Sequence, residues 1–241
     1  MMTTWVEYFD NLRQNSTLYA LQSAAYVASL TAALPLRRSD RVLDFGCGFG
    51  LVAAHLAPHV SEMWLWDPAS NMRNAARRNT AHLPNVQMCD LSALEREDTQ
   101  RAATPLPPMD VILVNSVVQY MTMAELSIWL GRWRELLARD GRLVLSDLIP
   151  TEHSVVSDTA DLLMFGARHR APMTALGQAV GGVIHYLRMR QASPLTRIGQ
   201  DELAQRAAVA GLSSDALPAN LTHLRHRWTA ILTPRLTPES A

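Results

Sequence analysis

The strongest constraint in the sequence is a set of three short apolar runs that carry an aspartate at their carboxyl ends. The aspartates are Asp44, Asp67 and Asp90, so both intervals are 23 residues. Short apolar runs of this kind are typical of strands buried in a parallel sheet. The carboxyl ends of neighbouring parallel strands converge on one crevice, so we expect the three carboxylates to surround a single ligand.

The first run leads directly into a glycine-rich turn, Gly-Cys-Gly-Phe-Gly at residues 46–50. Glycines at such a turn let the backbone bend sharply and approach a ligand closely. A dinucleotide-binding fingerprint needs a small residue where Leu51 stands, and a Walker loop needs a Gly-Lys-Ser/Thr sequence that is absent. Asp44 would repel a pyrophosphate but suits an ammonium group. The spacing places Asp67 to accept both hydroxyls of a ribose and Asp90 to accept from an exocyclic amine.

Strand-like and helix-like segments alternate along most of the chain, which predicts an α/β protein with a parallel sheet and right-handed crossovers. Thr122 and Glu125 form a capping box that opens one of the helices. The last two strand-like runs have too few residues between them for a crossover helix, so we expect them to pair antiparallel at the sheet edge. The expected strands are 41–46, 63–67, 86–90, 109–115, 142–148, 213–217 and 227–232, and the expected helices are 5–34, 50–58, 69–82, 122–138 and 200–210.

Composition excludes several classes of protein. The 22 basic and 22 acidic side chains cancel, which removes the positive field that sequence-independent nucleic-acid binding requires. The two cysteines form no Cys-x-x-Cys pair, which disfavours a structural zinc site and a disulfide framework. No apolar run approaches the roughly 20 residues of a membrane span, and the first residues lack a signal-peptide layout. We therefore expect a reduced, cytoplasmic protein with no nucleic-acid, membrane or metal partner.

These motifs resemble those of the class I S-adenosylmethionine-dependent methyltransferases, of the small-molecule, natural-product type. Residues 44–50 are similar to the first motif of that family, Asp67 to its ribose acid, and Cys89-Asp90-Leu91 to its adenine-side acid. Residues 115–120, Asn-Ser-Val-Val-Gln-Tyr, look like the corresponding segment of methyltransferases from polyketide and nonribosomal peptide pathways. Residues 136–145 are similar to the lead into the fifth strand, and residues 226–234 to the last strand of small-molecule members.

The resemblance implies a Rossmann-like, seven-stranded, mostly parallel sheet in the order 3-2-1-4-5-7-6 with the last strand antiparallel. It implies one methyltransferase domain over residues 1–241. The expected parts are an N-terminal helical cover at 1–40, a cofactor-binding core at 41–150, a helical lid insertion at 151–195 and the completion of the core at 196–241.

The resemblance also implies S-adenosylmethionine as cofactor and S-adenosylhomocysteine as product. An N-terminal aromatic residue often closes over the cofactor in this family, and by analogy Tyr19 is the candidate, although helix packing would explain it equally. The cofactor-binding residues expected on these grounds are Tyr19, Asp44, Gly46, Cys47, Gly48, Asp67, Pro68, Asp90, Leu91, Asn115 and Ser116.

Motifs that the chain lacks narrow the acceptor. Enzymes that methylate exocyclic amines carry Asn-Pro-Pro-Tyr where this chain has Asn115-Ser-Val-Val, and magnesium-dependent catechol enzymes cluster acids at that position. The apolar side chains of residues 151–195 indicate a lid over a hydrophobic acceptor, although helix packing or a homodimer contact would also explain them. We expect methylation of oxygen, carbon or nitrogen in secondary metabolism, on an acceptor that is either free or tethered to a carrier protein. The alternatives are a non-methylating reaction assisted by the same cofactor, such as a cyclisation, and a non-catalytic partner subunit.

A general base is needed only if the nucleophile arrives protonated. His169, inside the expected lid, is the first candidate for that base, and Tyr120 is the second. Arginines at 168, 170, 188 and 190 could meet a substrate carboxylate or an acidic carrier protein, but solvated helix faces explain them as well.

Overall fold

A single seven-stranded sheet forms the centre of the molecule. The computed structural model describes residues 2–11, 17–91, 106–152, 154–189 and 194–235. The strand order is β3-β2-β1-β4-β5-β7-β6, which confirms the predicted order. β7 is antiparallel to both of its neighbours, and the pairs among β1 to β5 are parallel. The strands are β1 (Arg41–Phe45), β2 (Glu62–Trp66), β3 (Val86–Met88), β4 (Met109–Asn115), β5 (Leu137–Leu148), β6 (Leu212–Ala216) and β7 (Trp228–Pro234).

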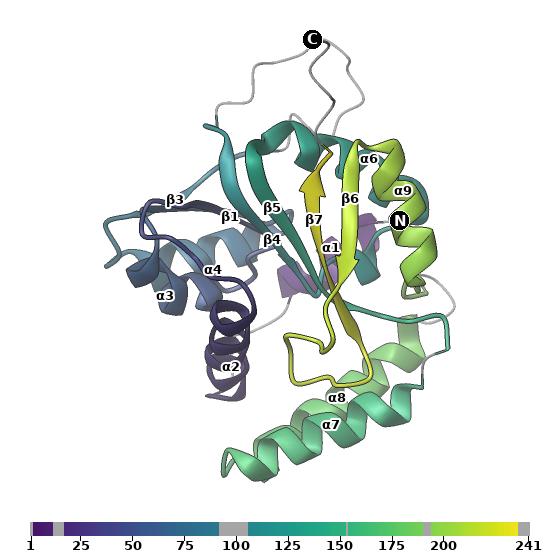
Figure 1. Ribbon diagram of the computed structural model, residues 1–241. Coiled ribbons are helices and arrows are strands. Elements are labelled where there is room, and N and C mark those ends of the chain that lie inside the picture. The colour runs from purple at the N-terminus through teal and green to yellow at the C-terminus, as the bar shows by residue number, and fades with distance from the viewer. Residues whose placement is uncertain (1, 12–16, 92–105, 153, 190–193, 236–241) are drawn as a thin grey trace, which may run out of the picture.

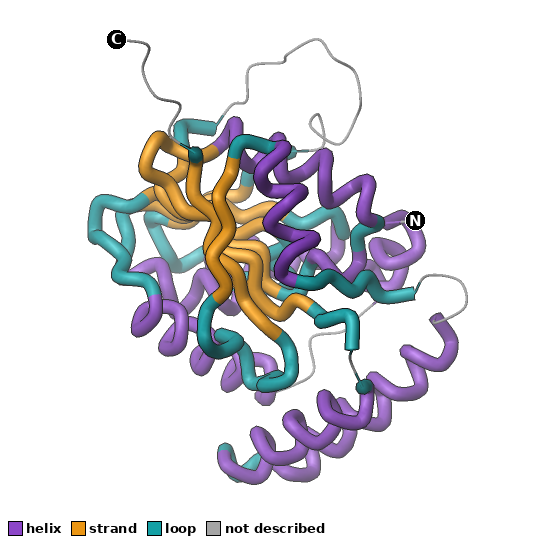
Figure 2. The backbone as a smooth tube through the Cα atoms, turned by 45° about the vertical axis from the view of Figure 1, so that its right-hand side comes forward, coloured by secondary structure: helices purple, strands orange, loops and turns teal. Residues whose placement is uncertain are grey.

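Helices cover both faces of this sheet and make a three-layer sandwich (Figure 2). One face packs against α2 (Thr17–Ala33), α3 (Leu51–Leu56) and α4 (Ser70–Thr80). The other face packs against α6 (Met123–Leu136) and α9 (Gln200–Val209). Among the described residues, none of the helices combines the length and the apolar character that crossing a bilayer requires.

The protein has two hydrophobic cores, one on each face of the sheet, because the side chains of a strand such as β1 point alternately to the two faces. Val42 belongs to the cluster under α2 and α3, whereas Leu43 and Phe45 belong to the cluster under α6 and α9. Successive side chains of a strand point to opposite faces, so a strand covered on both sides is apolar throughout. The Phe45 ring centroid lies 4.5 Å from that of Trp129 and 5.1 Å from that of Trp133, which ties α6 to the centre of the sheet.

Two further helices, α7 (Val155–Arg168) and α8 (Pro172–Met189), lie side by side beyond the end of the sheet where β4 and β5 finish (Figure 1). They occupy most of the stretch expected as a lid insertion. A short first helix, α1 (Met2–Asn11), lies behind the sheet in the same view. The carboxyl ends of the parallel strands are therefore flanked by α1, α2, α7 and α8.

The structure changes several predicted boundaries. Within the helix expected over residues 5–34 the structure describes α1 and α2, and residues 12–16 between them lie outside the described residues. The helix over 122–138 keeps the predicted Thr122 capping box but ends at Leu136, and β5 begins at once. The register of β4 with β5 shifts between Met109 and Val111, so β5 is irregular around Gly141, where a Cβ atom would lie 2.8 Å from the Met109 carbonyl oxygen. β3 ends at Met88, before Asp90.

Candidate cofactor and acceptor site

A cavity of about 960 Å³ lies at the carboxyl ends of β1, β2 and β4. The turn after β1 forms its floor, and side chains from α1, α2, α7, α8 and the loop between β6 and β7 complete its walls. Nine of the eleven residues predicted to bind the cofactor line this cavity. They are Tyr19, Asp44, Gly46, Cys47, Gly48, Asp67, Pro68, Asn115 and Ser116.

The turn after β1 depends on its glycines. Gly46, Gly48 and Gly50 have φ angles of 77°, 53° and 73°, in the left-handed region that other residues rarely adopt. A Cβ atom on Gly46 would lie 2.4 Å from Cγ2 of Val117, in the segment after β4. Glycine at position 46 thus lets the turn after β1 approach the segment after β4 closely. The backbones of these two segments lie together at one end of the cavity.

Asp44 places a buried carboxyl group at the cavity floor. Its side chain is buried, and its Oδ2 atom has no hydrogen-bond partner among the described residues. Burial raises the pKa of Asp44 to about 7, and the nearby charge of Asp67 raises it further in the same direction. A buried carboxylate oxygen without a hydrogen-bond partner is energetically costly unless a ligand supplies a donor. An ammonium group on a bound ligand would be such a donor.

Asp67 holds the glycine turn as well as facing the cavity. Its Oδ2 accepts from the backbone N–H of Gly48 and its Oδ1 from that of Ala69, both at 2.9 Å. Burial raises the pKa of Asp67 to about 6 in spite of these two hydrogen bonds. An ionised carboxylate has about four acceptor positions, so two remain for the hydroxyls of a ribose.

The other two predicted residues, Asp90 and Leu91, do not line the cavity. Leu91 is buried in the core under α6, and Asp90 is exposed. β3 is only three residues long, so the chain has left the sheet before it reaches Asp90. The role of Asp90 toward an adenine amine stays a prediction, and the chain that follows, residues 92–105, lies outside the described residues.

One wall of the cavity contains a buried ion-pair network around Arg227 that the sequence motifs did not reveal. Arg227 Nη1 donates to Asp147 Oδ2 at 3.0 Å and to Gln119 Oε1 at 2.6 Å, and its Nη2 donates to Asp158 Oδ2 at 2.7 Å. Asp158 is on α7 and Arg227 immediately precedes β7, so the Arg227–Asp158 ion pair joins α7 to the sheet. The Arg227 guanidinium holds the pKa of Asp147 below its ordinary value, although burial acts the other way. The sequence placed Arg227 only in the last strand and gave no sign of these partners, because they are brought together only by the fold.

Aromatic side chains of α1 form another wall. The ring centroids of Trp5 and Phe9 lie 4.6 Å and 5.2 Å from that of Tyr120, and Tyr19 lies 6.0 Å from Phe49. All five line the cavity. Burial raises the pKa of Tyr120 well above its ordinary value, which makes its phenolate, the form that accepts a proton, costly.

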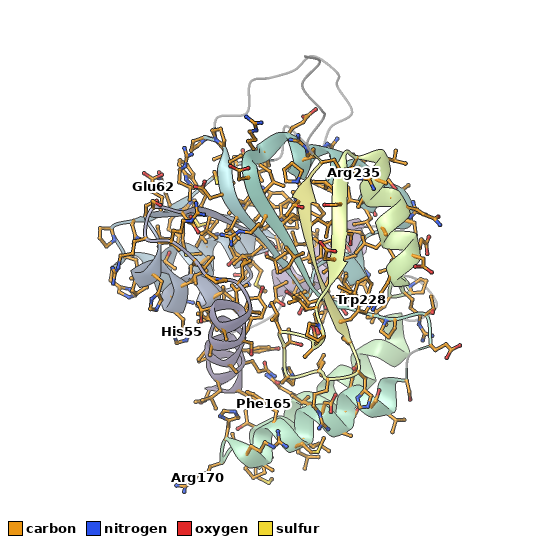
Figure 3. All side chains as sticks on the ribbon, viewed as in Figure 1. His55, Glu62, Phe165, Arg170, Trp228 and Arg235 are labelled. Carbon is orange, nitrogen blue, oxygen red and sulfur yellow. The ribbon has the colours of Figure 1, made fainter. Side chains whose placement is uncertain are left out.

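His169, the first candidate for a general base, lies away from the cavity. It is exposed at the C-terminal end of α7, with its ring 4.2 Å from that of Phe165, and it is not among the residues that line the cavity. Figure 3 shows Phe165 toward the sheet and Arg170, one residue beyond His169, at the outer tip of the helix pair. Arg168 and Arg170 are exposed at the same tip. The cavity wall contains His223 instead, which no sequence pattern had marked.

The sheet order, the glycine turn and the acids beside it define the Rossmann-like methyltransferase fold. Residues 43–143 match a family model described as a methyltransferase domain. The matched stretch is less than half of the chain, so what the match shows is that this part of the chain is similar to a methyltransferase domain. Methyltransferases of this kind use S-adenosylmethionine as cofactor.

Solved structures with the same fold include methyltransferases with bound product. The DhpI–SAH complex has a TM-score of 0.62 at 13% identity and matches 98% of both chains. The magnesium protoporphyrin IX methyltransferase ChlM of Synechocystis PCC 6803, with bound SAH, has a TM-score of 0.53 at 16% identity, over 94% of this chain and 90% of its own. Phosphoethanolamine N-methyltransferase 1 of Haemonchus contortus has a TM-score of 0.62 at 14% identity, over all of this chain and 50% of its own.

One curated relative is similar in sequence. It is a probable non-canonical nonribosomal peptide synthetase, CymA, of Salinispora arenicola, 34% identical over 116 residues. The match covers 45% of this chain and about 1% of the length of the synthetase.

Proposed function

We propose that the protein transfers the methyl group of S-adenosylmethionine to oxygen, carbon or nitrogen of a hydrophobic small molecule. The observation that carries this proposal is the buried Asp44 oxygen without a partner, at the floor of a cavity whose glycine turn belongs to the matched methyltransferase domain. A protein that bound no cofactor would have no reason to keep a buried carboxyl oxygen without a partner at a cavity.

The residues present fit the cofactor. Asp44 would pair with the ammonium of its methionine part, Asp67 would accept from the ribose hydroxyls, and Asp90 is the candidate for the adenine amine. When bound, the cofactor supplies a methyl group on a sulfonium centre and carries its own leaving group. What remains for the protein is to hold the nucleophile in line and exclude water, and such positioning contributes roughly 7–11 kcal/mol.

The acceptor side of the cavity combines apolar side chains with the polar groups of Asp158, His223 and Arg227. It is lined by the aromatic side chains of α1, by Leu162 on α7 and by Ala179 on α8, which fits a hydrophobic acceptor. The similarity to part of a nonribosomal peptide synthetase supports a role in secondary metabolism and an acceptor attached to a carrier protein. Exposed apolar side chains on α7 and α8, including Val156, Met173 and Val180, are the candidate surface for a homodimer. We expect this activity in the cytoplasm.

Transfer of a labelled methyl group tests the proposal. The purified protein is incubated with methyl-labelled S-adenosylmethionine and small-molecule extracts, or with carrier proteins loaded with aromatic acyl groups. Label in an organic-soluble product, lost in Asp44→Asn, is the expected result. Binding of S-adenosylhomocysteine without any label transfer would instead indicate a non-methylating reaction or a partner subunit, and absence of binding would overturn the proposal.

A further inference from the structure

His223 is placed where a proton acceptor would be needed. It lies in the loop between β6 and β7 and lines the cavity, with its ring 4.9 Å from that of Phe165. His169 packs on the same phenylalanine but lies outside the cavity. Of these two histidines, only His223 can meet a bound molecule.

A neighbouring amide sets the tautomer of the His223 ring. Nε2 of Gln22, on α2, lies 3.3 Å from Nε2 of His223. With the amide donating, the ring Nε2 carries a lone pair and Nδ1 carries the hydrogen. The Gln22 amide also donates to Oε1 of Gln178 on α8 at 3.5 Å. If a hydroxyl of a bound molecule donates to His223 Nε2 in place of Gln22, the Gln22 amide therefore still has a hydrogen-bond partner.

The surroundings of His223 keep its ring neutral. Burial lowers the pKa of His223 below its ordinary value. The charged groups that act on it are Asp158 and Asp161 on α7, Asp147 on β5, and Arg227 before β7; the acids oppose the shift and Arg227 adds to it. Gln22 and Gln178, from α2 and α8, are uncharged. A neutral imidazole with a lone pair is the form that accepts a proton.

We propose that His223 accepts the proton of a phenolic hydroxyl on the acceptor, which makes the reaction an O-methylation. The inference rests on the function proposed above. The hydroxyl proton goes to Nε2 of His223, an oxygen lone pair forms the new O–CH₃ bond, and the electrons of the broken S–CH₃ bond remain on sulfur. His223 afterwards releases the proton to water.

The chemistry of the cavity favours a phenol over other nucleophiles. A carboxylate needs no base. The guanidinium of Arg227, which would have to receive a carboxylate, is already engaged by five hydrogen bonds to Asp147, Asp158 and Gln119. A neutral amine already has a lone pair for the attack, so it needs no base to remove a proton first. A phenol loses its proton to imidazole far more readily than an alkyl alcohol does, and its ring suits walls that include Trp5, Phe9 and Tyr120.

The test uses 4-nitrophenol, which absorbs visible light when ionised, bound to the protein that already holds S-adenosylhomocysteine. The apparent pKa of the bound phenol is measured in the wild type, in His223→Asn and His223→Gln, and in His169→Ala. Thermal unfolding and binding of S-adenosylhomocysteine verify that every variant is folded and loaded.

We expect the bound phenol to ionise at a pH lower by about one unit or more in the wild type and in His169→Ala than in either His223 variant. The same ionisation in all four proteins, or a shift that follows His169, would overturn the assignment of His223. Failure of the loaded wild type to bind 4-nitrophenol would overturn the phenolic acceptor. Failure to bind S-adenosylhomocysteine would overturn the proposed function itself, which is a separate result.

Discussion

Ser116 and Asp147 both adopt a left-handed backbone conformation at the ends of adjacent strands, and Ser116 Oγ donates to Asp147 Oδ2 at 2.8 Å. Their φ angles are 58° and 68°. Such conformations cost about 1–3 kcal/mol each in residues other than glycine, and they persist where surrounding contacts fix them. Asn220, Thr222 and Arg227 also donate to the Asp147 carboxylate. The wall of the cavity at β4 and β5 is therefore fixed before any ligand binds.

This arrangement predicts that replacing Asp147 lowers the stability of the protein more than replacing Ser116 does. Asp147→Ala leaves Arg227 buried with one acid fewer, and breaking a buried ion pair in this way costs about 3–5 kcal/mol. Ser116→Ala removes one hydrogen bond and keeps the backbone conformation, which costs about 1–2 kcal/mol. Urea unfolding measures both. Equal losses would show that the two residues do not form the network described.

Gly46 and Gly131 provide a matched pair of glycine substitutions. Gly46→Ala adds a Cβ atom at 2.4 Å from Val117 and forces alanine to a φ of 77°, so binding of S-adenosylhomocysteine and stability should both fall. Gly131 lies within α6 with nothing within 4 Å of an added Cβ, so Gly131→Ala should stabilise the protein by about 0.4–1 kcal/mol and leave binding unchanged. Calorimetry and thermal unfolding give both values. Normal binding by Gly46→Ala would contradict the role of this turn.

Asp44 should reduce the stability of the ligand-free protein as pH rises. Its pKa is about 7 in the folded protein against an ordinary value of 3.8, so the folded state disfavours the ionised form. The unfolded chain binds fewer protons between these values, and stability falls as pH rises through that window. The free energy of unfolding of Asp44→Asn should therefore rise relative to that of the wild type from pH 4 to pH 7, by up to about 4 kcal/mol. Thermal unfolding across this range measures the gain, and a difference independent of pH would argue against a buried, raised-pKa carboxyl group.

Asp67→Ala should weaken S-adenosylhomocysteine about tenfold or more. The change removes acceptors for the ribose hydroxyls, each worth about 1.5–3 kcal/mol, and releases the backbone N–H groups of Gly48 and Ala69. Titration calorimetry on the folded variant measures the loss. Unchanged affinity would show that Asp67 only supports the turn.

The sheet could be predicted from the sequence because its signals are local. The apolar run at Arg41–Phe45, the glycines after it and the Thr122 capping box each report on a few consecutive residues. The same motifs predicted that Asp44, Asp67 and the glycine turn lie together, and they line one cavity. The acceptor end did not, because His223, Asp158 and Arg227 belong to different elements that meet only in the folded protein. His169 was chosen from its position in the expected lid, and a helix presents only part of its surface to a cavity.

If Asp44 receives the ammonium group of S-adenosylmethionine, as proposed above, the binding of the product S-adenosylhomocysteine should depend on pH. Below its pKa of about 7 the carboxyl group must lose a proton before it can pair with an ammonium group. Titration calorimetry should therefore find S-adenosylhomocysteine bound about tenfold more weakly by the wild type at pH 6 than above pH 7. Asp44→Asn should bind weakly over the whole range. Tight binding by Asp44→Asn with the pH dependence of the wild type would show that Asp44 does not receive the ammonium group.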